Sequence, residues 1–322
     1  MDLLKIGMAC VAGALTIAAP LALPQTYPSK PIRLIVPYAA GGTTDIVARL
    51  IAQKLADRLG QPVLVDNRPG ADTLIGTEAV SKAVPDGYTV LLSSTSAMAI
   101  LSHTRKRLPY DPFKDFVHVA QATYNQYALA VNPSVPAASV AELVALARSR
   151  PGKLNYASGS ASGNIAGEMF KFATRTDIVH VPYKGVGPAT TDLLSGQVNM
   201  MFGTFANVIP YFKARKLNVL AVTGEKRSSA LPDVPTMAEA GIKDFESSGS
   251  YGISVPRGTP TEIVKKLSGE VSAVVRMPDI VEKMLAQGLE PRFGTPEEYT
   301  ALLRNEFEKY RILLPRIGIK PE

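Results

Sequence analysis

Cysteine and tryptophan are almost missing from this sequence: Cys10 is the single cysteine among 322 residues, and there is no tryptophan. Cys10 lies in an N-terminal stretch with the pattern of a signal peptide, so a mature chain would contain no thiol. That excludes a disulfide framework, a cysteine nucleophile and a thiolate metal site. The three histidines, His103, His118 and His180, are far apart and lack the spacing of metal ligands. We therefore predict neither a metal nor a cofactor.

Catalytic motifs are missing as well. No G-x-x-x-x-G-K-[ST] segment for nucleotide phosphates occurs. The stretch GSASG, Gly159–Gly163, fails the G-x-S-x-G pattern of a nucleophile elbow because its central residue is Ala161. The sequence therefore favours a binding protein over an enzyme, with hydrolysis or isomerisation of a small acid as the weaker alternative.

A long apolar run occurs only at the N-terminus. Lys5 precedes an uncharged stretch from Ile6 to Gln25, and this order is typical of a secretory signal peptide. We predict that residues 1–25 are a cleaved signal and that the protein is exported to the periplasm. A retained membrane anchor and a lipid-modified Cys10 are the alternatives. The cleavage site stays open, because no clean A-x-A precedes Gln25.

The charge of the chain is mildly positive, with a formal net charge of +7 and a pI near 9.3. The basic residues are scattered and form no arm for nucleic acid, so we expect no nucleic-acid partner. The charge favours solubility, or a weak positive field that attracts anionic ligands. Hydrophobic residues make up 46% and charged residues 20%, as in ordinary globular proteins. The length suggests two compact domains.

Strand and helix patterns alternate along the chain. The segment 31–38 has the β-branched content of a buried strand, and a helix follows that Thr44 or Asp45 can cap and Gly60 can end. Two further strands, 62–67 and 88–94, flank another helix, and this βαβαβ order predicts a parallel sheet. A second α/β series starts near Tyr127 and repeats the alternation as far as Gly224.

The regular alternation of strand and helix patterns ends after Gly241. An extended segment, 245–260, is followed by two helical patterns, 260–277 and 295–318. The second begins with Thr295 at the N-cap and Glu298 three residues later, as in a capping box.

Two loops of small residues, Ala39–Asp45 and Ser158–Asn164, each separate a strand from a helix. Small side chains let a ligand approach the backbone, and N–H groups at a helix N-terminus favour an anion. In open α/β sheets, ligands bind at the carboxyl ends of strands, where these loops lie. Neither loop contains Lys or Arg, which points to a small carboxylate rather than a polyphosphate. The alternative is that each loop is only a tight chain reversal.

The mature chain, from about Tyr27 to the C-terminus, resembles the periplasmic solute-binding receptors of tripartite tricarboxylate transporters, the Bug family. The likeness rests on several segments in this order: YPSKPIRLIVPYAAGGTTDIVARLIAQKLADRLGQPVLVDNRPGA, DGYTVLLSS, VPYKGVGPATTDLLSGQVNMMF, LAVTGEKRSSALPDVPTMAEAG and GISVPRGTP. Each segment alone is moderately specific, and together they are strongly specific.

The resemblance implies an α/β fold of the periplasmic-binding-protein type II, with two lobes that close on a ligand like a Venus flytrap. Residues 26–125 and 251–322 would form lobe 1, and residues 126–250 lobe 2. It implies a small organic carboxylate as ligand, membrane transporter subunits as partners and a monomeric receptor. A receptor whose closed form signals to the ectodomain of a membrane sensor is the alternative that the sequence leaves open.

The resemblance also places the ligand-binding residues. One wall would consist of Tyr38, Ala40, Gly41, Gly42, Thr43, Thr44 and Asp45, with Ser94 nearby. The facing wall would consist of Ser158, Ser160, Ala161, Ser162 and Asn164. The far end would consist of Gly203, Thr204 and Tyr251.

This chain departs from the family pattern at that far end. Gly203 and Thr204 follow MMF where relatives often have an Asp, and Ser250 replaces a Trp that relatives often carry before the aromatic-Gly pair. We expect a larger pocket that disfavours an amino-acid ammonium and accepts a dicarboxylate or an aromatic carboxylate. Whether Asp45 and Tyr183 contact ligand stays open.

Overall fold

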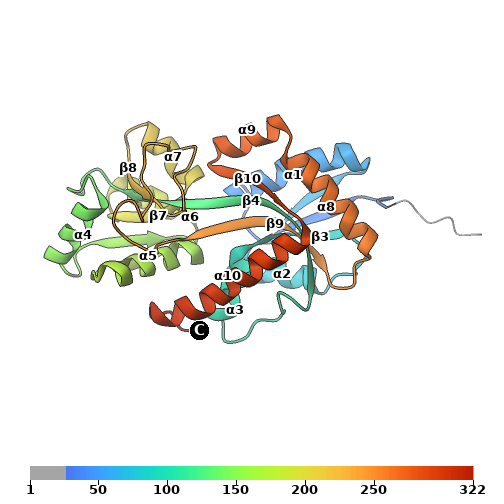
Figure 1. Ribbon diagram of the computed structural model, residues 1–322, viewed down its shortest axis with the longest axis horizontal. Coiled ribbons are helices and arrows are strands. Elements are labelled where there is room, and N and C mark those ends of the chain that lie inside the picture. Colours follow the sequence, from blue (N-terminus) through green and yellow to red (C-terminus); the bar gives the residue numbers. More distant parts are fainter. Residues whose placement is uncertain (1–26, 322) are drawn as a thin grey trace, which may run out of the picture.

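Two β-sheets joined by a shared long strand organise the chain, for which a computed structural model describes residues 27–321 (Figure 1). The predicted signal peptide, residues 1–25, lies outside the described residues. We use lobe 1 for the elements around sheet A and lobe 2 for those around sheet B. The elements before the shared strand are β1 (Ile32–Val36), α1 (Thr43–Leu59), β2 (Val63–Asn67), α2 (Leu74–Ser81), β3 (Thr89–Ser94), the π-helix η1 (Ser96–Ile100) and α3 (Leu101–Thr104).

The shared strand is β4 (Phe116–Val131), which is long enough to belong to both sheets. The elements of lobe 2 that follow are α4 (Val140–Ser149), β5 (Asn155–Ser158), α5 (Ala161–Thr174), β6 (Val179–Pro182), α6 (Val186–Ser195), β7 (Met200–Thr204), α7 (Phe205–Lys213) and β8 (Asn218–Val222). The chain then returns through β9 (Ser248–Pro256), α8 (Thr261–Val275), α9 (Pro278–Ala286), β10 (Leu289–Gly294) and α10 (Pro296–Arg316).

Sheet A has the strand order β2-β1-β3-β9-β4-β10, and sheet B has the order β8-β4-β7-β5-β6. The first three strands are parallel, as the βαβαβ pattern predicts. The returning strand β9 runs antiparallel to both β3 and β4, so each sheet is mixed rather than parallel throughout. Strands β4 and β9, which connect the lobes, are antiparallel to each other, and Figure 1 shows them passing side by side between the lobes.

The sequence of α1 explains how the helix is placed. Its buried side chains recur at helical spacing and include Val47, Ile51 and Leu55, which pack with β1 and α8 against one face of sheet A. The helix ends at Gly60, which adopts the left-handed conformation with φ 68°, as predicted. This packing directs the N-terminus of α1 to the carboxyl end of β1.

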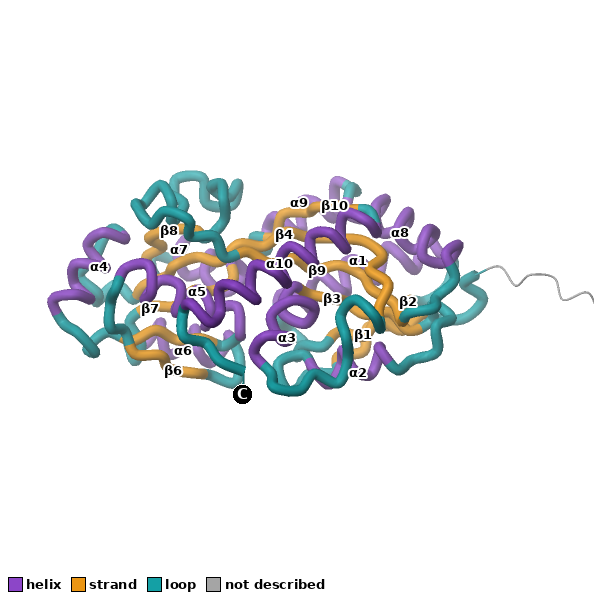
Figure 2. Tube along the Cα trace, turned by 60° about the horizontal axis from the view of Figure 1, so that its bottom comes forward, coloured by secondary structure: helices purple, strands orange, loops and turns teal. Residues whose placement is uncertain are grey.

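Helix α10 joins the two lobes at their surface, and Figure 2 shows it lying along both. Near its start, Tyr299 and Leu303 pack in the lobe 1 core, whereas Tyr310 and Leu314 pack with α4 and α5 in the lobe 2 core. The predicted capping box is confirmed: Thr295 accepts from the Glu298 N–H, and the Glu298 side chain accepts from the Thr295 N–H.

Candidate functional site

The loop between β1 and α1 leaves its backbone open. Residues 39–42 are exposed, and Gly41 has φ 84°, a conformation that favours glycine. Gly42 is the N-cap of α1 and no side chain caps the helix. The first N–H groups of an α-helix have no intrahelical partner. The start of α1 therefore offers bare amide donors to an anion.

The prediction that Thr44 or Asp45 caps α1 is wrong, because both lie inside the helix after the Gly42 N-cap. The buried Asp45 carboxylate instead accepts from the Gly41 N–H at 3.0 Å, from Arg49 Nε at 3.0 Å and from Asn67 Nδ2 at 3.0 Å. Burial acts to raise the pKa of Asp45, but these three donors together lower it below its usual value. Asp45 is thus fully engaged in shaping the loop.

The loop between β5 and α5 has a similar design with a side-chain cap. Ser160 is the N-cap of α5 and accepts from the Gly163 N–H at 3.2 Å. Gly159 has no room for a side chain, because a Cβ there would collide with the backbone of Gly185. Ser162 is buried in the first turn. The loop is therefore held tightly between α5 and the start of α6.

The fold brings these two predicted walls together. Ser162 Oγ of α5 lies 3.0 Å from Ser96 Oγ of η1, which links lobe 2 to lobe 1. On the lobe 1 side, the Tyr38 hydroxyl lies 2.8 Å from Ser94 Oγ, and the Tyr38 ring meets the Tyr251 ring edge-on at 6.3 Å. Sequence reasoning missed Ser96, since it starts a π-helix that no local pattern announces.

Tyr127 is a second residue that sequence reasoning did not place in the site. It is buried on β4, and burial first and Tyr251 second raise its pKa, whereas Ser162 lowers it. Its phenol thus has Ser162 of the facing wall and Tyr251 of the far end as neighbours. We name Tyr38, Ser94, Ser96, Tyr127, Ser162 and Tyr251 the interlobe cluster. It is composed of neutral hydroxyl donors and aromatic rings.

The far end of the predicted site is only partly as expected. Thr204 is paired with Tyr127 in the β4–β7 register, and its Oγ1 is buried without a partner. A Cβ on Gly203, however, would meet the side chains of Met201 and Val208 in the lobe 2 core. The missing side chain at Gly203 therefore faces core packing rather than open space, so the expectation that it enlarges the pocket is wrong.

The predicted residues Asn164 and Ser158, and Tyr183, whose role was left open, have partners within the chain. Asn164 Oδ1 lies 2.7 Å from the Tyr156 hydroxyl. The Tyr183 hydroxyl donates to Asp192 of α6 at 2.6 Å. Ser158 Oγ lies 2.6 Å from His180 Nε2, a contact that the sequence does not reveal.

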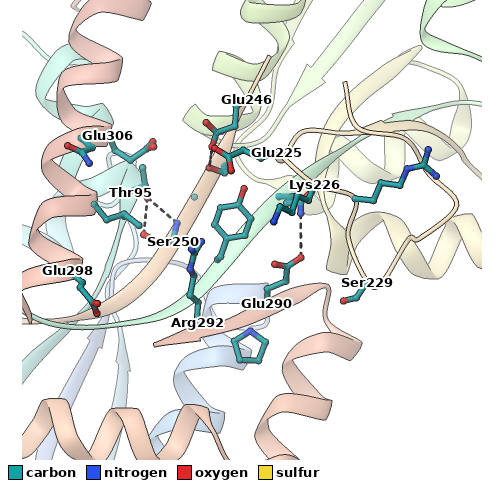
Figure 3. A pocket seen from close by; sticks show the side chains of 18 of the residues that line it. Thr95, Glu225, Lys226, Ser229, Glu246, Ser250, Glu290, Arg292, Glu298 and Glu306 are labelled. Atoms are coloured by element: carbon teal, nitrogen blue, oxygen red, sulfur yellow. Dashed lines mark hydrogen bonds between the residues drawn. The ribbon is translucent and has the colours of Figure 1, made fainter. Parts of the chain in front are cut away.

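A separate groove of about 1030 Å³ contains none of the predicted site residues (Figure 3). Tyr124 and Gln126 of β4 line it, and since side chains alternate along a strand, Tyr127 is directed to the opposite face. Its charged lining is Glu225, Glu246, Glu290, Glu298 and Glu306 with Lys226, Arg227 and Arg292. The excess of carboxylates would repel an organic acid, so this groove does not suit the predicted ligand.

Within residues 27–321, no helix combines the length and apolarity needed to cross a bilayer. In that same part of the chain, no group of three or more His, Cys, Asp or Glu side chains is placed to hold a metal ion.

Comparison with known proteins identifies the class. The model of the tripartite tricarboxylate transporter family receptor matches residues 47–319. The chain therefore belongs to this family of periplasmic solute-binding proteins, which is a binding-protein family and not an enzyme family. Protein BugT of Bordetella pertussis is 36% identical over 307 residues, which cover 94% of this chain and 94% of BugT.

Solved structures agree with this assignment. R. palustris Rpa4515 with adipate has a TM-score of 0.87 at 34% identity, covering 92% of this chain and 100% of that chain. MatC from Rhodopseudomonas palustris with bound malate has a TM-score of 0.80 at 30% identity, covering 91% of this chain and 100% of that chain. The predicted periplasmic-binding α/β fold is thereby confirmed.

Proposed function

We propose that this protein captures a small dicarboxylate between its lobes in the periplasm and delivers it to the membrane subunits of a tripartite transporter. It would be exported with residues 1–25 as a cleaved signal and act as a monomer. The lobes would divide at residues 125/126 and 250/251, in the segments where β4 and β9 connect them. The ligand would contact the predicted walls and the interlobe cluster.

One observation carries this proposal: the Ser96–Ser162 contact holds the N-terminus of α5 against lobe 1, next to the Tyr38–Ser94 pair. Helix α1 also starts with uncapped amides. Helix N-termini and hydroxyl groups suit carboxylate oxygens. Solved relatives with adipate and with malate show that this fold accommodates dicarboxylates.

The chemistry of the site disfavours an amino acid. An ammonium group needs a free carboxylate, and Asp45 already accepts from Gly41, Arg49 and Asn67. The tyrosines of the interlobe cluster instead offer apolar ring faces together with hydroxyl donors. A linear dicarboxylate could place its chain against the rings and its carboxylates at polar groups.

A thermal-shift screen tests this function. The protein is unfolded and refolded to remove co-purified ligand, then heated with adipate, malate, citrate, benzoate or glutamate. Because a ligand stabilises the state it binds, a dicarboxylate at about 100 times its Kd should add about 2.7 kcal/mol to the free energy of unfolding. We expect dicarboxylates to give the largest shifts. The absence of a shift with every carboxylate would refute the proposal.

A further inference from the structure

His180 supports the Ser/Gly loop from the neighbouring strand. Its Nε2 lies 2.6 Å from Oγ of Ser158, the buried last residue of β5. In the parallel β5–β6 register, His180 is opposite Tyr156, and the two rings stack with centroids 4.8 Å apart and planes 20° apart. The imidazole is therefore fixed both by its ring face and by its polar edge.

A second set of contacts fixes the ring that His180 stacks on. The Tyr156 hydroxyl lies 2.7 Å from Asn164 Oδ1 and 2.7 Å from Glu168 Oε1, so it can donate its proton to either. Lys171 Nζ donates to Glu168 at 2.8 Å. Gly167 leaves the space that the Tyr156 ring occupies, since a Cβ there would collide with it. A chain of contacts therefore leads from Glu168 of α5 through the Tyr156 and His180 rings to Ser158, at the start of the predicted ligand loop.

We propose that His180 is a positioning residue for the carboxylate site: its Nε2–H donates to Ser158 Oγ and thereby directs the Ser158 O–H toward the ligand. This inference rests on the proposed function. A serine hydroxyl has one proton to donate and two lone pairs to accept with. When Nε2 carries a proton, Ser158 accepts from it and keeps its own O–H for a carboxylate oxygen.

The opposite proton arrangement would weaken binding. When Nε2 lacks a proton, Ser158 must donate to the imidazole, and only its lone pairs remain for the ligand. Lone pairs repel a carboxylate, whereas an O–H bonded to a charged acceptor is among the stronger hydrogen bonds. Whether Nε2 of His180 carries a proton thus decides whether Ser158 attracts or repels the ligand.

The surroundings of His180 leave it neutral near pH 7. Burial is the largest influence and lowers its pKa below the usual value, Glu168 acts to raise the pKa and Lys171 to lower it. Both charged residues are on α5, the helix that packs over this part of β5 and β6. A carboxylate bound next to Ser158 favours the protonated imidazole. Binding should therefore take up protons, and affinity should increase as the pH falls toward the pKa of the free protein.

Calorimetry with adipate tests the proton linkage. Titrations at about pH 6.5 in two buffers of different ionisation enthalpy give the number of protons taken up on binding. We expect a positive fraction for the wild type. His180→Gln should retain affinity within about threefold, because its amide also donates to Ser158, and should take up no proton at this site.

His180→Phe is the matched control, because it keeps an aromatic ring on Tyr156 but has no donor. It should lose affinity by about tenfold, the effect of one hydrogen bond to a charged group, and should also lose the proton uptake. Equal proton uptake in the wild type and in His180→Phe would overturn the inference. So would unchanged affinity in His180→Phe.

A ligand-free measurement separates this inference from the proposed function. Nitrogen NMR of ¹⁵N-labelled histidine, with His180 assigned from His180→Gln, reports which ring nitrogen is protonated. We expect Nε2–H in the wild type and a mixture of tautomers in Ser158→Ala. A neutral His180 protonated only at Nδ1 would refute the positioning role, even if adipate binds. If no dicarboxylate binds, the proposed function fails, and the tautomer still decides the His180–Ser158 contact.

Discussion

At the scale of single residues, the adjacent glycines of the first loop have different tasks. Gly42 has φ −83° and ψ 170°, which any residue adopts, and a Cβ there meets only the Ala39 carbonyl oxygen at 3.8 Å. Gly42→Leu should therefore fold normally. Its side chain would cover the amides at the start of α1, so we expect affinity for adipate to fall at least tenfold while the thermal midpoint changes little.

Gly41→Ala is the matched control for this prediction. Gly41 has φ 84° and nothing lies within 4 Å of an added Cβ, so only the backbone is strained, at a cost of about 1 kcal/mol. We expect Gly41→Ala to lower stability with a smaller effect on affinity. Calorimetry and urea denaturation of both variants measure the two quantities. Wild-type affinity in Gly42→Leu would argue against a ligand at this loop.

Asp45 illustrates a residue whose role is to shape the site. Asp45→Asn removes the charge that organises Gly41, Arg49 and Asn67, so we expect a loss of roughly 2 kcal/mol in the free energy of unfolding. The folded-state pKa of Asp45 is lowered, so its contribution is present above about pH 4 and is lost as the pH falls through the folded value. The difference between variant and wild type should therefore shrink in acid.

The control for Asp45 is Asp66, a more exposed acid on strand β2, against which α1 packs. Asp66→Asn breaks contacts with Arg33 and Arg68 at the surface, and such pairs contribute less than about 1 kcal/mol. Urea denaturation at several pH values compares the two variants. Equal stability losses would show that the Asp45 contacts stabilise the fold no more than surface ion pairs do.

At the scale of elements, a buried polar network ties β3, β4, β9 and α10 together. His118 Nδ1 lies 3.0 Å from Ser254 Oγ, which donates to Ser93 Oγ at 2.8 Å, and Ser93 is 3.0 Å from the Tyr299 hydroxyl. Burial lowers the pKa of His118 to about 4. A neutral imidazole is therefore part of the folded core of lobe 1.

This network predicts a loss of stability in mild acid. The unfolded chain protonates His118 near pH 6.5, whereas the folded chain protonates it only near its lowered pKa of about 4. The contribution of the neutral His118 to the free energy of unfolding is therefore complete above pH 6.5 and decreases as the pH falls from 6.5 to about 4. The loss should be on the order of 3 kcal/mol. His118→Phe should flatten this part of the stability profile measured by denaturation. His103→Gln, at a half-buried position, should retain most of the slope, and an equal flattening there would contradict the assignment.

Local elements with strong patterns were predictable from the sequence. The apolar stripe of α1, its end at Gly60 and the capping box of Thr295 and Glu298 all depend on residues close in the chain. The N-cap of α1 was misplaced, because Asp45 reaches back to Gly41 from inside the helix, and residue type alone does not distinguish the two arrangements.

The site residues that the sequence did not predict depend on contacts between segments that are distant in the chain. Tyr127 reaches the site only because β4 pairs with β7 and β9, and His180 meets Ser158 only because β6 lies beside β5. Ser96 meets Ser162 across the lobes. These pairings depend on strand register and lobe arrangement, which local periodicity does not encode. The sequence therefore indicated both loops, but it did not indicate Ser96, Tyr127 or the contact of His180 with Ser158.

At the scale of the whole molecule, β4 and α10 couple the two lobes. Strand β4 pairs with β9 and β10 in sheet A and with β7 and β8 in sheet B. Leu303 and Leu314 of α10 are fully buried, the first in the lobe 1 core and the second in the lobe 2 core. Because both connectors must come apart for either lobe to unfold, we expect one cooperative transition.

Paired truncations along α10 test this coupling. Leu303→Ala and Leu314→Ala should each cost about 2–5 kcal/mol, through lost burial and a cavity, and each should move the same single calorimetric transition. Since both lobes would contact the ligand, adipate should raise that transition as a whole in the wild type and in both variants. Two separated transitions, with Leu314→Ala shifting only one, would show instead that the lobes unfold independently and that α10 merely rests on them.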